Sequence, residues 1–257
     1  MADHQRVDVL GVHVSAINPT MALEQIAEWV DRGDRQYVCV TGVHGVTESR
    51  RDPELQSIHN ASGLTTPDGM PMVWCGRWAG ARWMRRVYGP DLMLEVVTEA
   101  AKRGWSSYFY GSTDATLSAL VSNLSKRIPG MNVAGTYAPP FRPLTPEEDA
   151  AVVERINAAR PDLVWVGLST PRQERWMAAH RSVLDAPVLL GVGAAFDFHA
   201  GAKRQAPKWM QRSGLEWLFR LLSEPRRLWR RYLVGNSTFL WGIARRRPRL
   251  VQPEVVR

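Results

Sequence analysis

The chain has 257 residues, close to half of them apolar, and a formal net charge of +8. This length suits one large domain or two small ones, and the apolar content excludes an intrinsically disordered chain. Its two cysteines, Cys39 and Cys75, lie among apolar neighbours without a CxxC or Cys/His pattern, so we expect reduced structural thiols rather than a disulfide or a zinc site.

The first residues, MADHQR, lack the apolar run of a signal peptide. No run of about 18 apolar residues, the length of a membrane-spanning helix, occurs further along the chain. We therefore expect a cytoplasmic protein that lies on any membrane it meets rather than crossing it.

Residues 1–200 alternate strand-like and helix-like segments. Continuous apolar runs predict strands that are buried on both faces of a parallel sheet, and cap residues predict the helices between them. The expected strands are 37–41, 105–111, 131–136, 162–167 and 187–193, and helices are expected to begin at 18–19, 52–53, 113 and 145. This order predicts a doubly wound, mostly parallel, Rossmann-like α/β sheet, whose ligands bind beyond the carboxyl ends of its strands.

The tail, residues 201–257, differs from this body in pattern and in charge. It contains 14 Lys/Arg and 3 Asp/Glu, a balance of +11, whereas residues 1–200 have a balance of −3. Its apolar residues fall at helical spacing on both sides of Pro225, with arginines between them. We predict an α/β core over 1–200 and, over 201–257, an appendage with two short amphipathic helices broken at Pro225. Its charge predicts an anionic partner, either lipid headgroups or nucleic acid.

Polar clusters that follow the expected strands are candidate ligand-binding loops. Thr41 and His44 come after strand 37–41, and Asp68 and Gly69 lie in the sequence TPDGMP. Asp68 is the candidate general base, because a carboxylate within hydrogen-bonding distance of an acceptor hydroxyl can remove its proton. An ordinary turn is the alternative at both places.

Arg86 is a candidate phosphate ligand, because a guanidinium binds phosphate through paired hydrogen bonds; a solvated arginine is the alternative. After strand 162–167, a small-residue loop leads into a helix N-terminus that could hold a phosphate or a uracil group, and Gln173 there could read a base or sugar edge. The other candidates at strand ends are Gly111, Ser112, Gly167, Glu174, Gly193 and Asp197.

Motifs of several other enzyme classes are missing from the sequence. No GxGxxG precedes an acidic residue by about twenty positions, and no GxxxxGK[ST] P-loop occurs. The histidines lack metal-ligand spacing, and no DxD pair is present to hold a metal-bound nucleotide-sugar. We therefore predict a site without a metal or another cofactor, in which cationic side chains and helix N-termini stabilise a leaving diphosphate.

Four segments together resemble the WecG/TagA/CpsF glycosyltransferase family (glycosyltransferase family 26): TPDGMPMVW, RVYGPDLM, VGLSTPRQERW and GVGAAFDFHAG. The resemblance extends over roughly residues 7–240. It implies an inverting, metal-independent transfer of a hexose or an N-acetylhexosamine, for example N-acetylmannosamine, from a UDP-sugar. The implied acceptor is a polyprenyl-diphosphate-linked sugar used in bacterial cell-surface polysaccharide synthesis.

The resemblance also implies roles for single residues. Asp68 matches the family's candidate base, Arg86 an arginine that contacts the diphosphate or the sugar, and Gln173 the polar residue of the PxQE loop. Thr41 matches the threonine of the pocket near the N-terminus.

Family members often carry an asparagine two positions after that threonine, where this chain has Val43. His44 is then expected to make a polar contact instead, and the identity of the donor sugar stays open.

In the same family, a C-terminal appendage docks on the inner face of the cell membrane and completes the active site. The resemblance therefore implies a peripheral membrane attachment for the basic tail here, whose arginine-rich and tryptophan-rich helices have the composition of interfacial helices. One tail arginine is expected to face the diphosphate, and the candidates are Arg220, Arg227 and Arg230.

Two other interpretations stay open from the residues alone. The basic tail could bind nucleic acid, although the acidic body and the lack of a nucleic-acid motif argue against it. The sheet could also serve a Rossmann-type oxidoreductase. The apolar surface of the tail could pack against a second subunit as easily as against lipid, so a homo-oligomer is left open.

Overall fold

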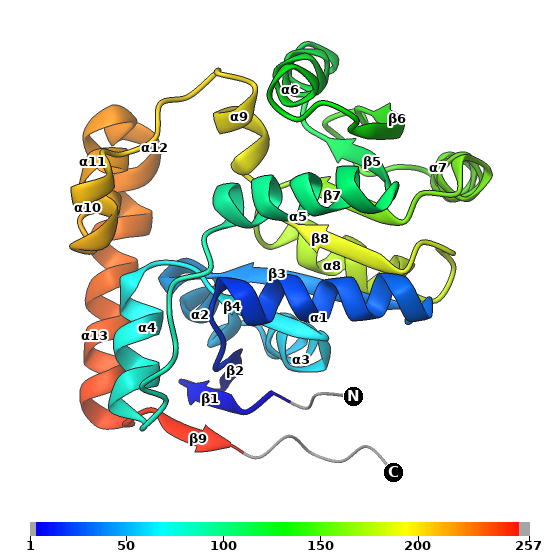
Figure 1. The fold of residues 1–257 in the computed structure, drawn as a ribbon. Helices are drawn as coiled ribbons and strands as arrows, with labels where there is room; N and C mark the ends of the chain where they lie inside the picture. Colours follow the sequence, from blue (N-terminus) through cyan, green and yellow to red (C-terminus); the bar gives the residue numbers. More distant parts are fainter. Residues whose placement is uncertain (1–3, 252–257) are drawn as a thin grey trace. The chain divides into compact units, whose positions relative to one another are not determined.

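The structure is a computed structural model that describes residues 4–251, and in it the chain forms two compact units (Figure 1). The first unit comprises residues 4–22, 40–88 and 205–251, and the second unit comprises residues 23–39 and 89–204. The boundary nearest to the expected tail falls between Arg204 and Gln205. That residues 1–200 form the catalytic core and residues 201–257 dock on a membrane stays a prediction.

A six-stranded parallel sheet has the strand order β4-β3-β8-β7-β5-β6. Its strands are β3 (Gln36–Thr41), β4 (Leu64–Pro67), β5 (Ser106–Gly111), β6 (Asn132–Tyr137), β7 (Leu163–Gly167) and β8 (Val188–Gly191). The inner strand β7 is almost wholly buried, whereas β6, which has a neighbouring strand on one side only, is partly exposed. The predicted α/β, Rossmann-like fold class is confirmed.

Helices alternate with these strands, and several begin at the predicted cap residues. Asn18 accepts a hydrogen bond from the backbone N–H of Met21 at 3.1 Å, and Thr145 forms a capping box with Glu148. The helices are α1 (Pro19–Arg32), α2 (Val43–Ser49), α3 (Pro53–Ala61), α4 (Met70–Trp78), α5 (Gly89–Arg103), α6 (Asp114–Arg127), α7 (Pro146–Ala159), α8 (Arg172–His180) and α9 (Ala195–His199).

The first unit also contains a small antiparallel sheet that was not predicted from the sequence. It has the order β2-β1-β9, with β1 (Arg6–Val9), β2 (Val12–Ser15) and β9 (Arg249–Val251). Leu10 and Gly11 both have positive φ in the turn of the hairpin, and Asp8 accepts a hydrogen bond from the N–H of Gly11 at 2.7 Å. Strands this short give too little alternation to be recognised in the sequence.

The tail folds into α10 (Lys208–Arg212), α11 (Glu216–Ser223), α12 (Pro225–Trp229), a π-helical turn (Arg230–Val234) and α13 (Gly235–Arg245). The predicted break at Pro225 is confirmed. The prediction of two short helices was incomplete, because helical structure continues through the π-helical turn into α13. There, Phe239 and Ile243 join a buried cluster with Val46 of α2 and the valines of the hairpin. No helix among residues 4–251 has the length and the apolar character needed to cross a bilayer.

Candidate active site

The candidate base, Asp68, follows β4 directly, and a backbone hydrogen bond fixes its position. Its N–H donates to the carbonyl oxygen of Thr41, the last residue of β3, at 2.9 Å. The approach is close enough to require glycine nearby, because a Cβ on Gly42 would lie 2.9 Å from the carbonyl oxygen of Asp68. Gly69 has a φ of 85° and begins the turn into α4. The predicted residues Thr41, Asp68 and Gly69 therefore lie together at the ends of two strands.

Arg86 lies beside this carboxylate. The segment that carries it runs next to β4, since the N–H of Val87 donates to the carbonyl oxygen of Pro67 at 3.0 Å. Arg86 Nη2 lies 3.7 Å from Asp68 Oδ1 and forms an ion pair with Glu216 of α11. Its guanidinium also stacks over the ring of Tyr88, at 3.9 Å from the centroid.

Burial raises the pKa of Asp68 from 3.8 to about 6, against the opposing charge of Arg86; Glu216 raises it as well. Arg220 and Arg231 lower it by smaller amounts. About a third of the Asp68 side chain (32%) remains exposed, so a substrate hydroxyl can reach it. The group is therefore a carboxylate at neutral pH and can take up a proton close to neutrality, as a general base must.

Two arginines of the tail contribute positive charge to this cluster. Arg220 lies on α11 and Arg231 on the π-helical turn, and both are close enough to lower the pKa values of Asp68 and His44. The Nε atoms of Arg86 and Arg231 and the hydroxyl of Tyr88 are buried without a hydrogen-bond partner. Such unsatisfied donors are costly unless a ligand or water meets them, so this cluster is a candidate binding site for an anion.

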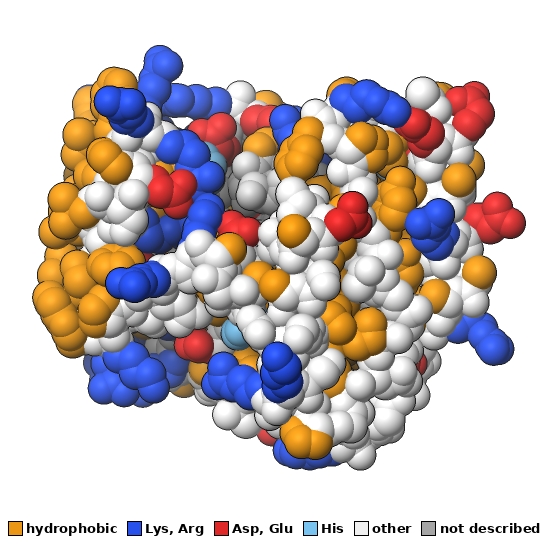
Figure 2. Space-filling view, turned by 90° about the horizontal axis from the view of Figure 1, so that it is seen from above, with side chains coloured by type: hydrophobic (Ala, Val, Ile, Leu, Met, Phe, Trp, Pro, Cys, Tyr) orange, Lys and Arg blue, Asp and Glu red, His pale blue; other side chains and the backbone are white. Residues whose placement is uncertain are grey.

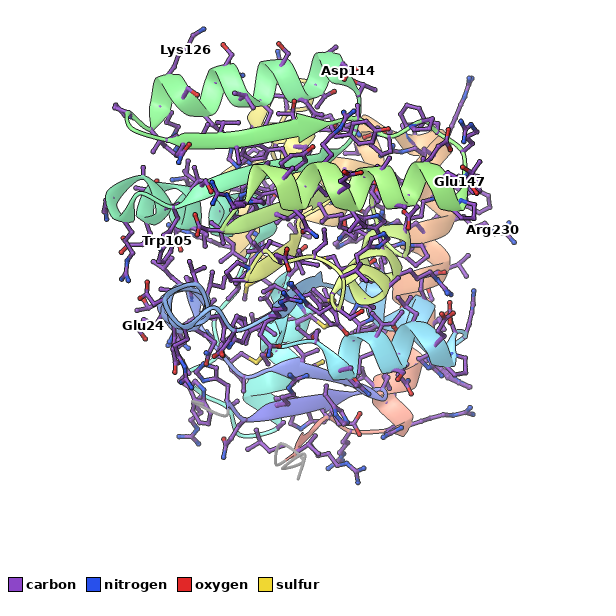
Figure 3. All side chains as sticks on the ribbon, turned by 90° about the vertical axis from the view of Figure 1, so that its right-hand side faces the viewer. Glu24, Trp105, Asp114, Lys126, Glu147 and Arg230 are labelled. Carbon is purple, nitrogen blue, oxygen red and sulfur yellow. The ribbon has the colours of Figure 1, made fainter. Side chains whose placement is uncertain are left out.

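The other predicted tail arginines lie elsewhere on the surface. Arg227 is exposed and pairs with Glu224 at 2.7 Å. Arg230 is also exposed, and Figure 3 shows it projecting away from the ribbon. The structure thus brings Arg220, but neither of these two, to Asp68.

His44 lies on α2 within the same cluster. Burial, together with the charges of Arg231 and Arg220, lowers the pKa of His44 to about 3, so the imidazole is neutral at physiological pH. Thr41 is buried, and its hydroxyl has no hydrogen-bond partner. Both side chains can therefore make polar contacts to a neutral ligand.

The remaining predicted residues belong to the second unit. Gln173 Nε2 and Thr170 Oγ1 both donate to Glu174 Oε1, at 3.0 and 2.9 Å. The other oxygens of these side chains, Gln173 Oε1 and Glu174 Oε2, are buried without a partner. Gly193 packs against this pair, since a Cβ there would lie 3.2 Å from Gln173 Oε1. These residues form a second polar cluster with unmet hydrogen-bonding capacity.

The last four candidates have contacts that suggest roles in packing, in turns or in ion pairs: Gly111, Gly167, Ser112 and Asp197. A Cβ on Gly111, which has a φ of 122°, would lie 2.7 Å from the backbone of Gly167. Ser112 has a positive φ at the start of the following turn. Asp197 forms an ion pair with Lys203 at 3.0 Å.

A profile of the Glycosyl transferase WecG/TagA/CpsF family matches residues 7–252. The chain belongs to this family. It is 31% identical to the N-acetylglucosaminyldiphosphoundecaprenol N-acetyl-beta-D-mannosaminyltransferase of Bacillus subtilis (strain 168). The alignment extends over 183 residues, which are 71% of this chain and 69% of that protein. It is 26% identical over 243 residues to the enzyme of the same name from Staphylococcus aureus (strain MW2), 93% of this chain and 92% of that one.

Membership of the WecG/TagA/CpsF family confirms the predicted resemblance and the enzyme class, a glycosyltransferase. The oxidoreductase and nucleic-acid-binding interpretations have no support from these comparisons. Within residues 4–251, no three His, Cys, Asp or Glu side chains gather as a metal-binding group. The expectation that the reaction needs no metal stays a prediction.

In this glycosyltransferase, Arg231, Glu216 and Tyr88 also belong to the cluster around Asp68 and were not predicted from the sequence. The tail has only three acidic residues, so an isolated acid four residues before Arg220 was an available signal for Glu216. No comparable signal distinguished Arg231 from Arg230. The choice between two adjacent arginines depends on how the π-helical turn rotates the chain.

Proposed function

We propose that the protein is an inverting glycosyltransferase that moves a hexose or an N-acetylhexosamine, of the N-acetylmannosamine type, from a UDP-sugar to a polyprenyl-diphosphate-linked sugar. The names of the relatives support this choice, since they describe transfer of an N-acetyl-β-D-mannosaminyl group to N-acetylglucosaminyldiphosphoundecaprenol. The single observation that carries the proposal is a carboxylate, Asp68, with a raised pKa beside Arg86 and within the field of Arg220 and Arg231.

In this mechanism Asp68 removes the proton from the acceptor hydroxyl. The oxygen then attacks the anomeric carbon of the donor from the face opposite UDP. A new glycosidic bond forms as the bond between that carbon and the diphosphate oxygen breaks, so the configuration inverts. UDP leaves as the anion, and the proton stays on Asp68 until it is lost to solvent.

The leaving diphosphate needs positive charge as its own charge develops. Arg86, Arg220 and Arg231 are the candidates, and their charges outnumber those of Asp68 and Glu216. The unpartnered Nε donors of Arg86 and Arg231 have capacity for phosphate oxygens. This supports a reaction that proceeds without a metal.

The other predicted residues are candidates for further contacts with the substrates. We assign Thr41, His44 and Gly69 to the sugar, because they lie in the Asp68 cluster. Gln173 and Glu174 of the second unit are proposed as substrate-binding groups in their own right, because their buried amide and carboxylate oxygens can accept hydrogen bonds from a polar ligand.

The tail is proposed to hold the enzyme on the inner face of the cell membrane. Figure 2 shows hydrophobic side chains gathered along the edge formed by the tail helices, with Lys and Arg side chains next to them. The exposed apolar residues there are Trp209, Leu222, Trp229, Leu233, Val234, Leu240 and Trp241. An apolar face bordered by arginines, including Arg227 and Arg230, suits an anionic bilayer surface.

The test is a transfer assay with the purified protein and a synthetic lipid-diphosphate-N-acetylglucosamine acceptor. UDP-N-acetylmannosamine, UDP-N-acetylglucosamine and UDP-glucose are offered separately, and the product is identified by mass spectrometry. We expect transfer from one UDP-sugar, an inverted anomeric configuration by NMR, and an unchanged rate in the presence of a chelator. No transfer from any UDP-sugar, or a retained configuration, would contradict the proposal, and loss of activity with the chelator would refute its metal-free form.

A further inference from the structure

A groove of about 550 Å³ lies along α13, where α2 and the turn after β1 pack against that helix. Its lining includes Ser237 and Thr238, one face of Trp241, and three arginines, Arg50, Arg245 and Arg246. In Figure 1, α13 leads away from α11 and α12 towards β9, so the arginines at its C-terminal end lie far along the helix from α11. The groove therefore requires an explanation other than the Asp68 site.

The arginines of this groove are only partly neutralised. Arg246 pairs with Asp8 at 2.5 Å, and Arg249 shares the same carboxylate at 3.4 Å. Within the part of the chain that the structure describes, neither Arg50 nor Arg245 has a carboxylate within ion-pairing distance. Two guanidinium groups without counter-ions therefore line a concave surface, and such a surface attracts an anion.

Backbone packing holds one of these guanidinium groups in place. Arg50 Nη1 donates to the carbonyl oxygen of Thr238 at 3.2 Å, so the side chain lies across α13. Gly242 makes this possible, because a Cβ there would lie 2.8 Å from Arg50 Nη1. Only one donor of Arg50 is used in this way, and a guanidinium has five.

Apolar surface adjoins the charged lining. The guanidinium of Arg245 stacks on Trp241, 3.3 Å from the ring centroid, and that indole is 42% exposed. Leu240, the preceding residue, is 67% exposed. In membrane proteins, tryptophan and arginine side chains are typical of the interface between lipid headgroups and acyl chains, and an exposed leucine can insert below them. A small free anion would use the arginines but would leave this apolar surface uncovered.

We propose that this groove binds the phosphate headgroup of an anionic glycerophospholipid, with Arg50 and Arg245 on the phosphate and Trp241 and Leu240 against the start of the acyl chains. The hydroxyls of Ser237 and Thr238 donate to the carbonyl oxygens of Leu233 and Val234 at 2.7 and 2.8 Å, so towards the lipid they can only accept, from a hydroxyl of the headgroup. The inference rests on the membrane docking included in the proposed function, and it adds a lipid class and a defined site to it.

The experiment compares two double variants in vesicle co-sedimentation. Arg50→Gln with Arg245→Gln removes the two arginines without counter-ions. Arg51→Gln with Arg247→Gln removes the same charge one and two positions further along the chain, and neither residue lines the groove. The vesicles contain phosphatidylcholine with or without phosphatidylglycerol, and activity on a detergent-dispersed acceptor checks that both variants fold.

Each basic residue at an anionic surface changes affinity roughly fivefold, so the groove variant is expected to lose roughly twenty-five-fold in affinity for phosphatidylglycerol vesicles. The control variant removes two charges that lie outside the groove lining and do not contact a bound headgroup, so its loss is expected to be clearly smaller, about fivefold or less. Equal losses in both variants would refute a defined site and leave only diffuse attraction. If the wild-type protein binds neither vesicle, membrane docking itself fails; if it binds and the groove variant binds equally well, only the groove inference fails.

A second measurement separates the lipid from a free anion. Calorimetric titration with dihexanoyl-phosphatidylglycerol below its micellar concentration is expected to show binding that the groove variant loses. Dihexanoyl-phosphatidylcholine and inorganic phosphate are expected to bind at least tenfold more weakly, since one lacks net charge and the other lacks the apolar part. Inorganic phosphate binding as tightly as the lipid would overturn the assignment to a headgroup.

Discussion

Glu216 and Asp68 share one guanidinium. Arg86 Nη2 forms an ion pair with Glu216 of α11 and lies 3.7 Å from Asp68 Oδ1. The two partners act on Asp68 in opposite directions, because the cation lowers its pKa and the second carboxylate raises it. A residue of the tail thereby takes part in setting the basicity of the candidate catalytic group, and a diphosphate bound to Arg86 would compete with Glu216.

The pH dependence of kcat/KM should report the pKa of Asp68. In the proposed mechanism Asp68 acts as a carboxylate, so activity is expected to rise with pH through a midpoint of about 6. Glu216→Gln removes a negative neighbour and should move the midpoint to lower pH, whereas Arg86→Gln removes a positive neighbour and should move it to higher pH. Rates of the three proteins measured between pH 4.5 and 8.5, a range set to bracket that value by about two units, test this.

A histidine is the usual explanation for a midpoint near 6, so His44 provides the control. The pKa of His44 lies at about 3, because the side chain is buried beside Arg231 and Arg220. His44→Gln is therefore expected to leave the midpoint of the acidic limb within about 0.3 units of the wild-type value, whatever happens to the rate. Disappearance of that limb in His44→Gln would assign it to the histidine.

Asp68→Asn should separate binding from transfer. The amide keeps the size of the side chain but cannot accept the proton, so transfer is expected to fall by roughly 10²- to 10⁴-fold. UDP binding, measured by calorimetry, should be retained, because the positive charge of the arginines is unchanged. A variant that transfers sugar at the wild-type rate would remove Asp68 as the base.

Arg230 and Arg231 are adjacent in the sequence and differ in their surroundings. Arg231 belongs to the charge cluster of Asp68, whereas Arg230 is exposed. Arg231→Gln is expected to weaken UDP binding roughly tenfold or more, the usual value of a hydrogen bond to a charged group. Arg230→Gln is the matched control and should change it by less than about twofold. The reverse order of the two losses would mean that the π-helical turn presents the other arginine to the nucleotide.

The exposed apolar face of the tail should control binding to vesicles. Replacing Leu222, Leu233 and Leu240 by serine removes side chains that are more than half exposed, so the fold should survive. Each buried leucine contributes about 1.5–3 kcal/mol, so vesicle binding is expected to become undetectable. Val183→Ser, an exposed apolar position in the second unit, is the control and should bind like wild type. Undiminished binding of the triple variant would place the membrane contact elsewhere.

Gly111 should be needed for packing, whether or not it contacts a ligand. Gly111→Ala combines a positive φ with a Cβ 2.7 Å from the backbone of Gly167, so we expect a loss of about 2 kcal/mol or more in unfolding free energy. Gly104 also has a positive φ but has no atom within 4 Å of its Cβ position. Gly104→Ala is therefore expected to cost only about 1 kcal/mol. Denaturant unfolding of the two variants measures the difference.

The alternation of apolar runs and cap residues predicted the parallel sheet because both signals are local. A buried parallel strand is apolar throughout, and Asn18, Asp52 and Thr145 cap their helices through hydrogen bonds spanning three residues. The motif around Asp68 could likewise be read as a strand-end loop. For such features the sequence contains the whole physical cause.

The tertiary structure alone decided which distant residues meet. Strand β9 pairs with β1 from the other end of the chain, and short strands carry no information about such a partner. Arg231, rather than Arg230, joins Asp68 because each residue turns a helix by about 100° and the π-helical turn alters that rotation. The Glu216–Arg86 pair depends on α11 packing beside the segment after α4. The sequence therefore shows which charged side chains are present, but only the packing of the helices determines which of them lie close to Asp68.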